Sequence, residues 1–246
     1  MKLIFFGTCG GIQTRTNTNV SFLIVDGELS ILVDASGNPV HYLERAGVDP
    51  RTLDILVLTH THTDHIYALP SLIHNLWLMK REKPLSIISN QFTLMKAQEL
   101  CTCFSLLSKE NLFQIDWVKD NLGRIELFTV DHSTPTSGFK IKSSTTAIVY
   151  SSDTSPCKRV IQEAEGAKAL IHEASNTSEF EDRLNSAGHS SGRQAGEVAA
   201  RAGVETLFLC HFDPQYANDS TELMAEAGIS FNGEVIVPEL FKTYEV

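Results

Sequence analysis

Three histidines and one aspartate within six residues have the types and the spacing of metal ligands. They form the segment His60-Thr61-His62-Thr63-Asp64-His65, directly after a run of apolar residues. Side chains alternate in extended chain, so the imidazoles of His60 and His62 point to the same side. Asp64 and His65 lie past the turn that follows and are free to face a second point. The segment therefore predicts ligands for two cations rather than for one.

Three further donors follow predicted strands elsewhere in the chain. His132, Asp153 and His211 each stand just past the carboxyl end of an apolar run. Ligands on separate strands can converge when the strands end at one edge of a sheet. We therefore predict one ion held by His60, His62 and His132, a second held by Asp64, His65 and His211, and Asp153 bridging the two.

Imidazole and carboxylate ligands suit zinc. Zn²⁺ accepts both at about 2.0–2.2 Å, and Mn²⁺ or Fe²⁺ also tolerates them. Two such ions about 3.5–4 Å apart lower the pKa of a bridging water toward about 7 and stabilise an oxyanion. The sequence thus predicts a hydrolase with two divalent metal ions, with zinc as the first expectation and manganese or iron as alternatives.

The spacing of apolar residues predicts hairpins and strand–helix units in alternation. Strands are expected at residues 1–7, 20–25, 29–34, 53–59, 85–89, 124–130, 139–142, 147–151, 169–171, 206–209 and 234–237. Helices are expected at residues 39–46, 66–81, 93–108, 156–165, 191–202 and 221–227. This mixture predicts an α+β fold in which two mixed sheets pack together with helices outside, a four-layer αββα sandwich. No linker stands out, so residues 1–246 are interpreted as a single domain.

The composition excludes several classes of protein. The formal net charge of −10 argues against long-range attraction of polyanions. The densest basic patch, Lys80-Arg81-Glu82-Lys83, is interpreted as a solvated helix end. No apolar run approaches the length of about 20 residues that a membrane span needs, and five cysteines without a CxxC pair indicate reduced thiols. We expect a cytoplasmic protein that does not bind membranes.

HxHxDH followed by a separate histidine, aspartate and histidine resembles the metallo-β-lactamase superfamily. Within it, the later segments resemble the ribonuclease Z branch, and the similarity covers nearly the whole chain. These segments are Phe6-Gly7-Thr8-Cys9-Gly10-Gly11-Ile12, Ser151-Ser152-Asp153-Thr154, His172-Glu173-Ala174-Ser175 (similar to the HEAT motif), Gly188-His189-Ser190-Ser191 with Gln194-Ala195 (similar to the HST segment), and Leu209-Cys210-His211-Phe212 with Tyr216. The resemblance implies the metallo-β-lactamase fold and a phosphodiester substrate.

The resemblance also implies roles for individual residues. Asp64 would accept a proton as well as bind metal, and His189 would contact the scissile phosphate. Independently, His189 precedes two serines that cap a predicted helix, where the helix dipole favours an anion. The alternative for His189 is a neighbour of the cap without a further role. His172 and Glu173 either hold a ligand in place or simply end a strand.

Two departures from ribonuclease Z argue against cleavage of tRNA. That family inserts a tRNA-binding arm, usually between the third histidine and the bridging aspartate. Here only 20 residues separate His132 from Asp153, and they are predicted to form two strands. The family's proline-and-arginine loop appears as residues 12–17, Ile-Gln-Thr-Arg-Thr-Asn, without the proline and with Asn17 near the expected arginine.

Four functions are therefore weighed. The first is a phosphodiesterase that uses a metal-bridging hydroxide on a small or single-stranded phosphodiester. The second is a tRNA 3′-processing endoribonuclease. In that case RNA would be the substrate, and a second copy of the chain would be a candidate partner. The third is a hydrolase of an ester, thioester or lactone on the same metal core. The fourth is a non-enzymatic binding protein, against which the complete ligand set argues.

Overall fold

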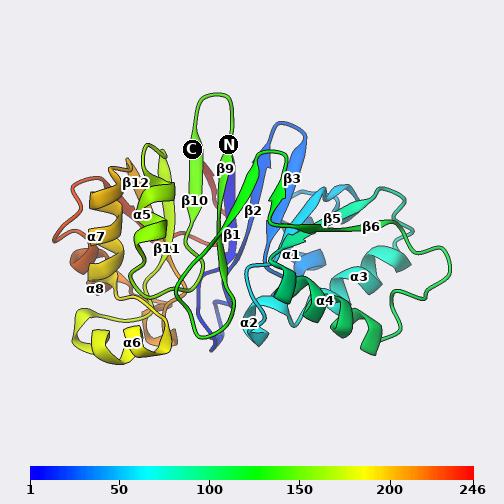
Figure 1. Cartoon of the computed structure of the whole chain (residues 1–246), viewed down its shortest axis with the longest axis horizontal. Helices are drawn as coiled ribbons and strands as arrows, with labels where there is room; N and C mark the ends of the chain where they lie inside the picture. The colour runs from blue at the N-terminus through cyan, green and yellow to red at the C-terminus, as the bar shows by residue number, and fades with distance from the viewer.

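Two seven-stranded sheets lie face to face in the computed structural model, which describes residues 1–246, and helices cover both outer faces (Figure 1). The first sheet has the order β14-β1-β2-β3-β4-β5-β6. Its strands are β1 Lys2–Gly7, β2 Ser21–Asp26, β3 Leu29–Val33, β4 Ile55–Val57, β5 Leu85–Ser89, β6 Ile115–Lys119 and β14 Thr243–Glu245. Strands β3 to β6 pair in parallel, and the strands on the other side of β3 are antiparallel.

The second sheet has the order β13-β12-β11-β10-β9-β8-β7. Its strands are β7 Asn121–Leu122, β8 Ile125–Thr129, β9 Ser137–Lys142, β10 Ala147–Tyr150, β11 Ala169–Glu173, β12 Thr206–Cys210 and β13 Glu234–Ile236. Strands β10 to β13 pair in parallel, and β7 to β10 pair antiparallel. Each sheet therefore joins an antiparallel part to a parallel part.

Helices form the two outer layers. Those on the first sheet are α1 Pro39–Arg45, α2 Thr63–Ile66, α3 Leu69–Leu78 and α4 Gln91–Cys103. Those on the side of the second sheet are α5 Lys158–Ala164, α6 Glu181–Ala187, α7 Gly192–Ala202 and α8 Thr221–Ala227. Short 3₁₀ turns are η1 Pro50–Thr52, η2 Ser178–Phe180 and η3 Pro214–Tyr216. The predicted αββα sandwich is confirmed. None of the helices combines the length and the apolar character that a membrane span requires.

Three apolar layers hold the sandwich together. The middle layer lies between the sheets and includes Phe5, Phe22, Phe139 and Tyr150. Separate outer layers join the first sheet to α1, α3 and α4, and the second sheet to α5, α7 and α8. Because successive side chains of a strand face opposite ways, strands covered on both sides read as continuous apolar runs. For this reason, the apolar segments before the donor residues could be predicted as buried strands.

Local signals set several boundaries. Gly27 turns the chain between β2 and β3 with a φ of +64°, the conformation that glycine adopts without strain. Ser191 and Gln194 form a capping box at the start of α7, and Gly203 ends that helix with a φ of +67°. Asn38 and Asn90 accept backbone hydrogen bonds at the starts of α1 and α4. The sequence therefore positions these elements by its own caps.

The helix predicted at residues 66–81 is shorter in the structure, where α2 ends at Ile66 and α3 covers Leu69–Leu78. The backbone of Ala35 is responsible, because its N–H bonds to the carbonyl of His65 and its carbonyl accepts from the N–H of Ala68. The expectation of a solvated helix end was wrong for Arg81, which is buried. Its guanidinium donates to the carbonyls of Pro50, Arg51, Leu53 and Pro84.

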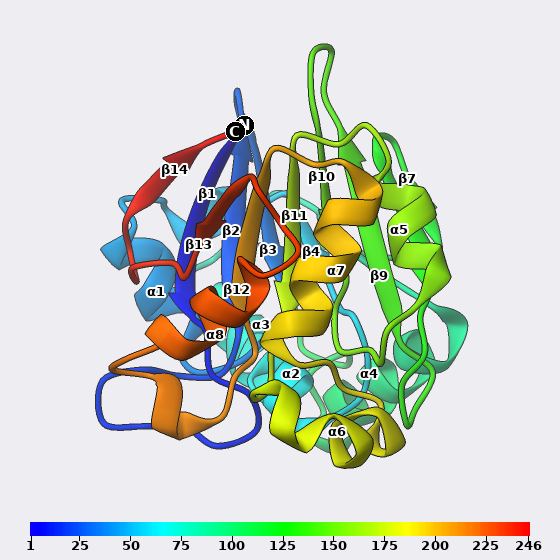
Figure 2. The ribbon, with the colours of Figure 1, turned by 90° about the vertical axis from the view of Figure 1, so that its left-hand side faces the viewer.

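The 20 residues between His132 and Asp153 form the antiparallel pair β9–β10 and its loops, as predicted. The tip of this hairpin projects at the opposite end of the molecule from α2 and α6 (Figure 1). The chain termini meet at the same end as the tip (Figure 2), where the amino group of Met1 donates to the carbonyl of Val246 over 2.7 Å.

Candidate metal centre

The predicted donors lie together at the carboxyl ends of strands from both sheets. The segment from His60 to His65 follows β4, His132 follows β8, Asp153 follows β10 and His211 follows β12. The two sheets open at this edge, so loops of both face the same space. Open α/β sheets bind ligands at this edge for the same reason. The fold therefore brings all seven donors into one centre.

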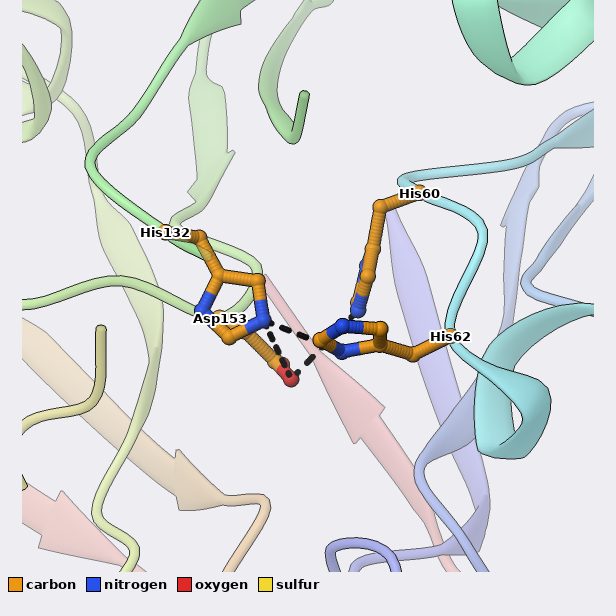
Figure 3. A group of neighbouring side chains, drawn as sticks. All are labelled: His60, His62, His132 and Asp153. Carbon is orange, nitrogen blue, oxygen red and sulfur yellow. Dashed lines mark hydrogen bonds and ion pairs between the residues drawn. The ribbon is translucent and has the colours of Figure 1, made fainter. Parts of the chain in front are cut away.

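A first cluster contains His60, His62, His132 and Asp153, whose donor atoms all lie within 4.8 Å of one another. Figure 3 shows His60 and His62 on one loop, His132 opposite them and the carboxylate of Asp153 pointing between. The His132 Nε2 atom lies 3.1 Å from Nδ1 of His62. Two neutral imidazoles bring ring nitrogens this close either around one proton or around one cation.

A second cluster contains Asp64, His65 and His211. Oδ2 of Asp64 lies 3.4 Å from Nε2 of His65 and 3.5 Å from Nε2 of His211. Ligands about 2.1 Å from a tetrahedral ion lie about 3.4 Å from one another. The spacing of these three atoms fits that geometry.

The carboxylate of Asp153 lies between the clusters. Its Oδ2 atom lies 3.7 Å from Nε2 of His60 and 4.0 Å from Nε2 of His132, both in the first cluster. The same oxygen lies 3.3 Å from Nε2 of His65 and 3.0 Å from Nε2 of His211, both in the second. The carboxylate of Asp153 thus lies near histidines of both clusters.

A divalent metal fits the donors because four of their inward atoms have no hydrogen-bond partner. Nε2 of His60, His65 and His211 and Oδ1 of Asp153 are buried without a hydrogen bond. A buried polar atom without a partner costs roughly 1–3 kcal/mol, and four such atoms converge here. A divalent cation among them would satisfy these atoms. The centre therefore could hold a divalent metal.

The outward ring nitrogens bond to the protein. Nδ1 of His132 lies 2.7 Å from the carbonyl oxygen of Gly188, and Nδ1 of His65 lies 2.7 Å from Oδ2 of Asp34. Because a carbonyl can only accept, Nδ1 of His132 carries the proton and its Nε2 keeps a lone pair for the centre. Nδ1 of His60 lies 3.0 Å from the Thr59 hydroxyl. Such partners fix the orientation of ligating histidines.

Asp34 is a site residue that the sequence analysis missed. It follows β3, is buried, and also accepts from the backbone N–H and hydroxyl of Thr59. Burial raises the pKa of its carboxyl group although His65 opposes the rise. The rule that selected Asp153, a polar donor at the end of an apolar strand, applies equally to Asp34 and could have found it.

Three residues at strand ends have left-handed backbones. Asp34, Ser152 and His211 have φ of +56°, +56° and +53°. A left-handed backbone costs about 1–3 kcal/mol in a residue with a Cβ. Such strain concentrates at functional sites. The sharp turn directs Asp34, Asp153 and His211 into the centre as their strands end.

The two clusters differ in protonation. Burial, together with His65, holds the pKa of His60 well below its usual range, and burial with His132 lowers the pKa of His62. Burial also opposes a charge on His211, but Asp153 and Asp64 outweigh it and raise its pKa to about 10. A positive charge on the histidines is therefore disfavoured in the first cluster and favoured on His211 in the second, where carboxylates face it.

His189 lies beside the donors, and Glu173 holds it there. Its ring lies 4.9 Å from that of His132 and 5.2 Å from that of His211, measured between centroids. Nδ1 of His189 lies 3.1 Å from Oε2 of the buried Glu173. Burial lowers the pKa of His189, but the Glu173 carboxylate more than reverses this and raises it.

Glu173 and its neighbour His172 have different positions. The Glu173 carboxylate also accepts from the N–H of Thr154 and the hydroxyl of Ser175, so it organises the loop around Asp153. His172 bonds through Nδ1 to the backbone carbonyl of Glu173, and its Nε2 has no partner. Of the two, only Glu173 bonds to a residue beside the donor clusters.

Comparison with known proteins agrees with this geometry. The model of the beta-lactamase superfamily domain matches residues 30–212. The ribonuclease Z of Archaeoglobus fulgidus is 24% identical over 299 positions, which cover 100% of this chain and 97% of that protein. The metallo-beta-lactamase fold protein YhfI of Bacillus subtilis has a TM-score of 0.84 at 24% identity, covering 99% of this chain and 98% of that one.

The short form of human tRNase Z has a TM-score of 0.82 at 18% identity, covering 100% of this chain and 99% of that one. The family model spans the HxHxDH segment, His132, Asp153 and His211, and the similar structures cover both sheets. The chain therefore belongs to the beta-lactamase superfamily and has the metallo-β-lactamase fold.

Proposed function

We propose that the protein is a metal-dependent phosphodiesterase related to ribonuclease Z, with two divalent ions at the candidate metal centre. One ion would be held by His60, His62 and His132, the other by Asp64, His65 and His211, with Asp153 shared. Zinc is the first expectation, because imidazole and carboxylate are its usual ligands. When bound, the ions would supply an activated water and neutralise charge on the phosphate.

The observation that carries the proposal is the position of His189. This histidine does not belong to either predicted ligand set, yet its ring lies against both His132 and His211. The Glu173 carboxylate lies 3.1 Å from Nδ1 of His189 and raises the pKa of His189, which favours a positive charge beside the candidate metal centre. An anionic phosphate gains from that charge, whereas a neutral ester or lactone gains less.

Asp64 is the proposed proton acceptor. Its side chain is partly exposed, unlike that of Asp153. A Cβ on Gly11 would lie 3.9 Å from Oδ2 of Asp64, so the glycine loop leaves space next to this oxygen. A reacting group could approach Asp64 from that side.

The absence of an arm directs the proposal toward small or single-stranded phosphodiesters. The alignment with the archaeal ribonuclease Z spans 299 positions, 53 more than the 246 residues of this chain. The residues from His132 to Asp153 form only β9, β10 and their loops. The net charge of −10 also does not favour long-range attraction of a tRNA.

A substrate panel on the metal-loaded protein tests the proposal. It compares bis-p-nitrophenyl phosphate, cyclic nucleotides, a lactone, a thioester and a precursor tRNA. We expect the highest kcat/KM on a small phosphodiester. Faster turnover of the lactone or thioester would contradict phosphodiester chemistry.

A tRNA 3′-processing endoribonuclease is the second candidate, because the relatives named ribonuclease Z match along the full chain. In that case a second copy of the chain could supply the RNA-binding surface. Accurate trimming of precursor tRNA by the isolated protein would favour this candidate over the first.

A further inference from the structure

A cavity of about 430 Å³ opens beside the candidate metal centre. His189, His211, Gly10 and Gly11 are among the residues that line it. Its volume is within the range of about 300–1,000 Å³ that small-molecule sites occupy. A group attached to a phosphate at the metal centre would therefore have space in this cavity.

One face of η2 and α6 forms another wall of the cavity. Phe180, Arg183, Leu184 and Ala187 all line it. Their spacing of three, four and seven residues places them on one side of a helix. This face is partly apolar but is not packed against the core, since Phe180 is 38% exposed.

Arg183 contributes a cation without an acidic partner. Its guanidinium forms no ion pair, whereas Arg193 on the next helix pairs with both Glu181 and Glu197. Asp213, an acidic residue that also lines the cavity, is engaged by the side-chain amide of Asn176 over 2.7 Å. In a chain with a net charge of −10, the unpaired Arg183 makes this wall attractive to an anion.

Phe180 contributes an aromatic surface on the same wall. An exposed phenyl ring can stack on a nucleobase, whatever the base, because every base has a π-face. Arg183 follows one helical turn later and can form two parallel hydrogen bonds to a phosphate. An aromatic platform followed by an arginine matches the base and the next phosphate of a nucleotide.

We propose that this cavity binds the nucleotide adjoining the scissile phosphate, with its base on Phe180 and its second phosphate on Arg183. The inference rests on the proposed phosphodiesterase function and names its substrate class, a nucleotide phosphodiester. The substrate gains affinity from one nucleotide rather than from a folded RNA.

Three esters with the same p-nitrophenolate leaving group separate these contributions. They are methyl p-nitrophenyl phosphate, thymidine 5′-(p-nitrophenyl phosphate), and the latter with an added 3′-phosphate. For the wild-type protein we expect kcat/KM to rise about tenfold with the nucleoside and about tenfold again with the second phosphate. Both gains should appear in KM.

Two variants remove one contribution each. Phe180→Leu should abolish the gain from the nucleoside, and Arg183→Gln the gain from the 3′-phosphate, while Arg183→Lys retains part of it. Phe104→Leu and Arg201→Gln are matched controls, because both residues are exposed and lie outside the cavity. Neither control should change the ratios among the esters.

Equal losses on all three esters, or unchanged ratios in both variants, would overturn the inference while leaving the phosphodiesterase intact. Hydrolysis of none of the esters by the metal-loaded wild type would contradict the proposed function itself. In that case, the affinity for thymidine 3′,5′-bisphosphate, measured by calorimetry, tests whether the cavity binds a nucleotide. Binding about tenfold weaker in each variant supports it, and equal binding overturns it.

Discussion

The two halves of the sandwich contribute residues to the candidate metal centre in different ways. In the first half, one short segment after β4, a loop followed by α2, carries His60, His62, Asp64 and His65. In the second half, three loops after β8, β10 and β12 carry one donor each. The first set is fixed by local chain geometry, whereas the second converges only when a whole sheet has formed. The first half should therefore tolerate distant changes better than the second.

Supporting contacts also stay within each half. His60 and His65 are held by Thr59 and Asp34 of the first half. In the second half, His132 bonds to Gly188 and His189 to Glu173. The two networks meet at Asp153, at the pair of His62 with His132 and at the pair of Asp64 with His211. These meeting points should be the most sensitive to substitution.

Replacing Asp153 should have the largest effect, because this carboxylate contacts donors of both halves. We expect Asp153→Ala to abolish activity and to lower the content of both ions, beyond the about 10–100-fold loss typical when a ligand's supporting partner is removed. Metal analysis and phosphodiester turnover check this. A fully metallated, active variant would contradict the shared role.

Substituting His189 separates binding of the substrate from binding of metal. His189→Ala should keep the wild-type metal content and lower kcat by about 10²–10³-fold, if the side chain meets the phosphate as charge develops. The surface residue His74→Ala is the control. An effect on KM alone would limit His189 to docking, and loss of metal would make it a ligand.

Asp34 tests the support of the first half. Asp34→Asn keeps the size of the side chain but weakens the hydrogen bond that orients His65. We expect metal affinity to fall about 10–100-fold, measured by competition with a chelating dye. Asp26→Asn, at the end of neighbouring β2, is the matched control, because its carboxylate pairs with Arg124 at the surface. Equal affinities in both variants would leave Asp34 without a role at the centre.

Two helix-ending glycines test the support of the second half. Gly188 and Gly203 both have left-handed backbones, with φ of +83° and +67°. A Cβ on Gly188 would lie 2.7 Å from Nδ1 of His132, whereas one on Gly203 would meet no atom within 4 Å. Both alanine variants should lose about 1–2 kcal/mol of stability.

Only Gly188→Ala should also lose activity, by about tenfold, because only this change displaces the support of His132 and so weakens a ligand. Thermal unfolding and turnover of the two variants, measured side by side, provide the test. Equal turnover would show that the second half adapts as readily as the first.

The sequence indicated which candidate donors lie together because each of their segments follows a strong apolar strand. Helix α8 and strand β5 were predicted with their observed bounds. The HxHxDH segment needs no distant information, since its spacing alone sets which side chains share a side. For the second half, the ends of the predicted strands indicated the candidate donors but not the distances between their side chains. Those distances depend on the packing of the two sheets, which periodicity does not determine.

Other features left weak signals. Edge strand β6 is only half-buried and contains Asp116 and Lys119, so its alternation is poor. Helix α6 has no buried residue, because one of its faces lines a cavity instead of the core. Arg81 appears in a charged tetrad, and only the loop carbonyls around it reveal that it is structural. Such features depend on tertiary contacts rather than local pattern.

Anomalous diffraction from a metal-loaded crystal tests the central claim most directly. Two peaks about 3.5–4 Å apart, with the carboxylate of Asp153 between them and the two predicted ligand sets around them, are the expected result. A single peak, or peaks away from Asp153, would contradict a centre that the two halves of the sandwich share.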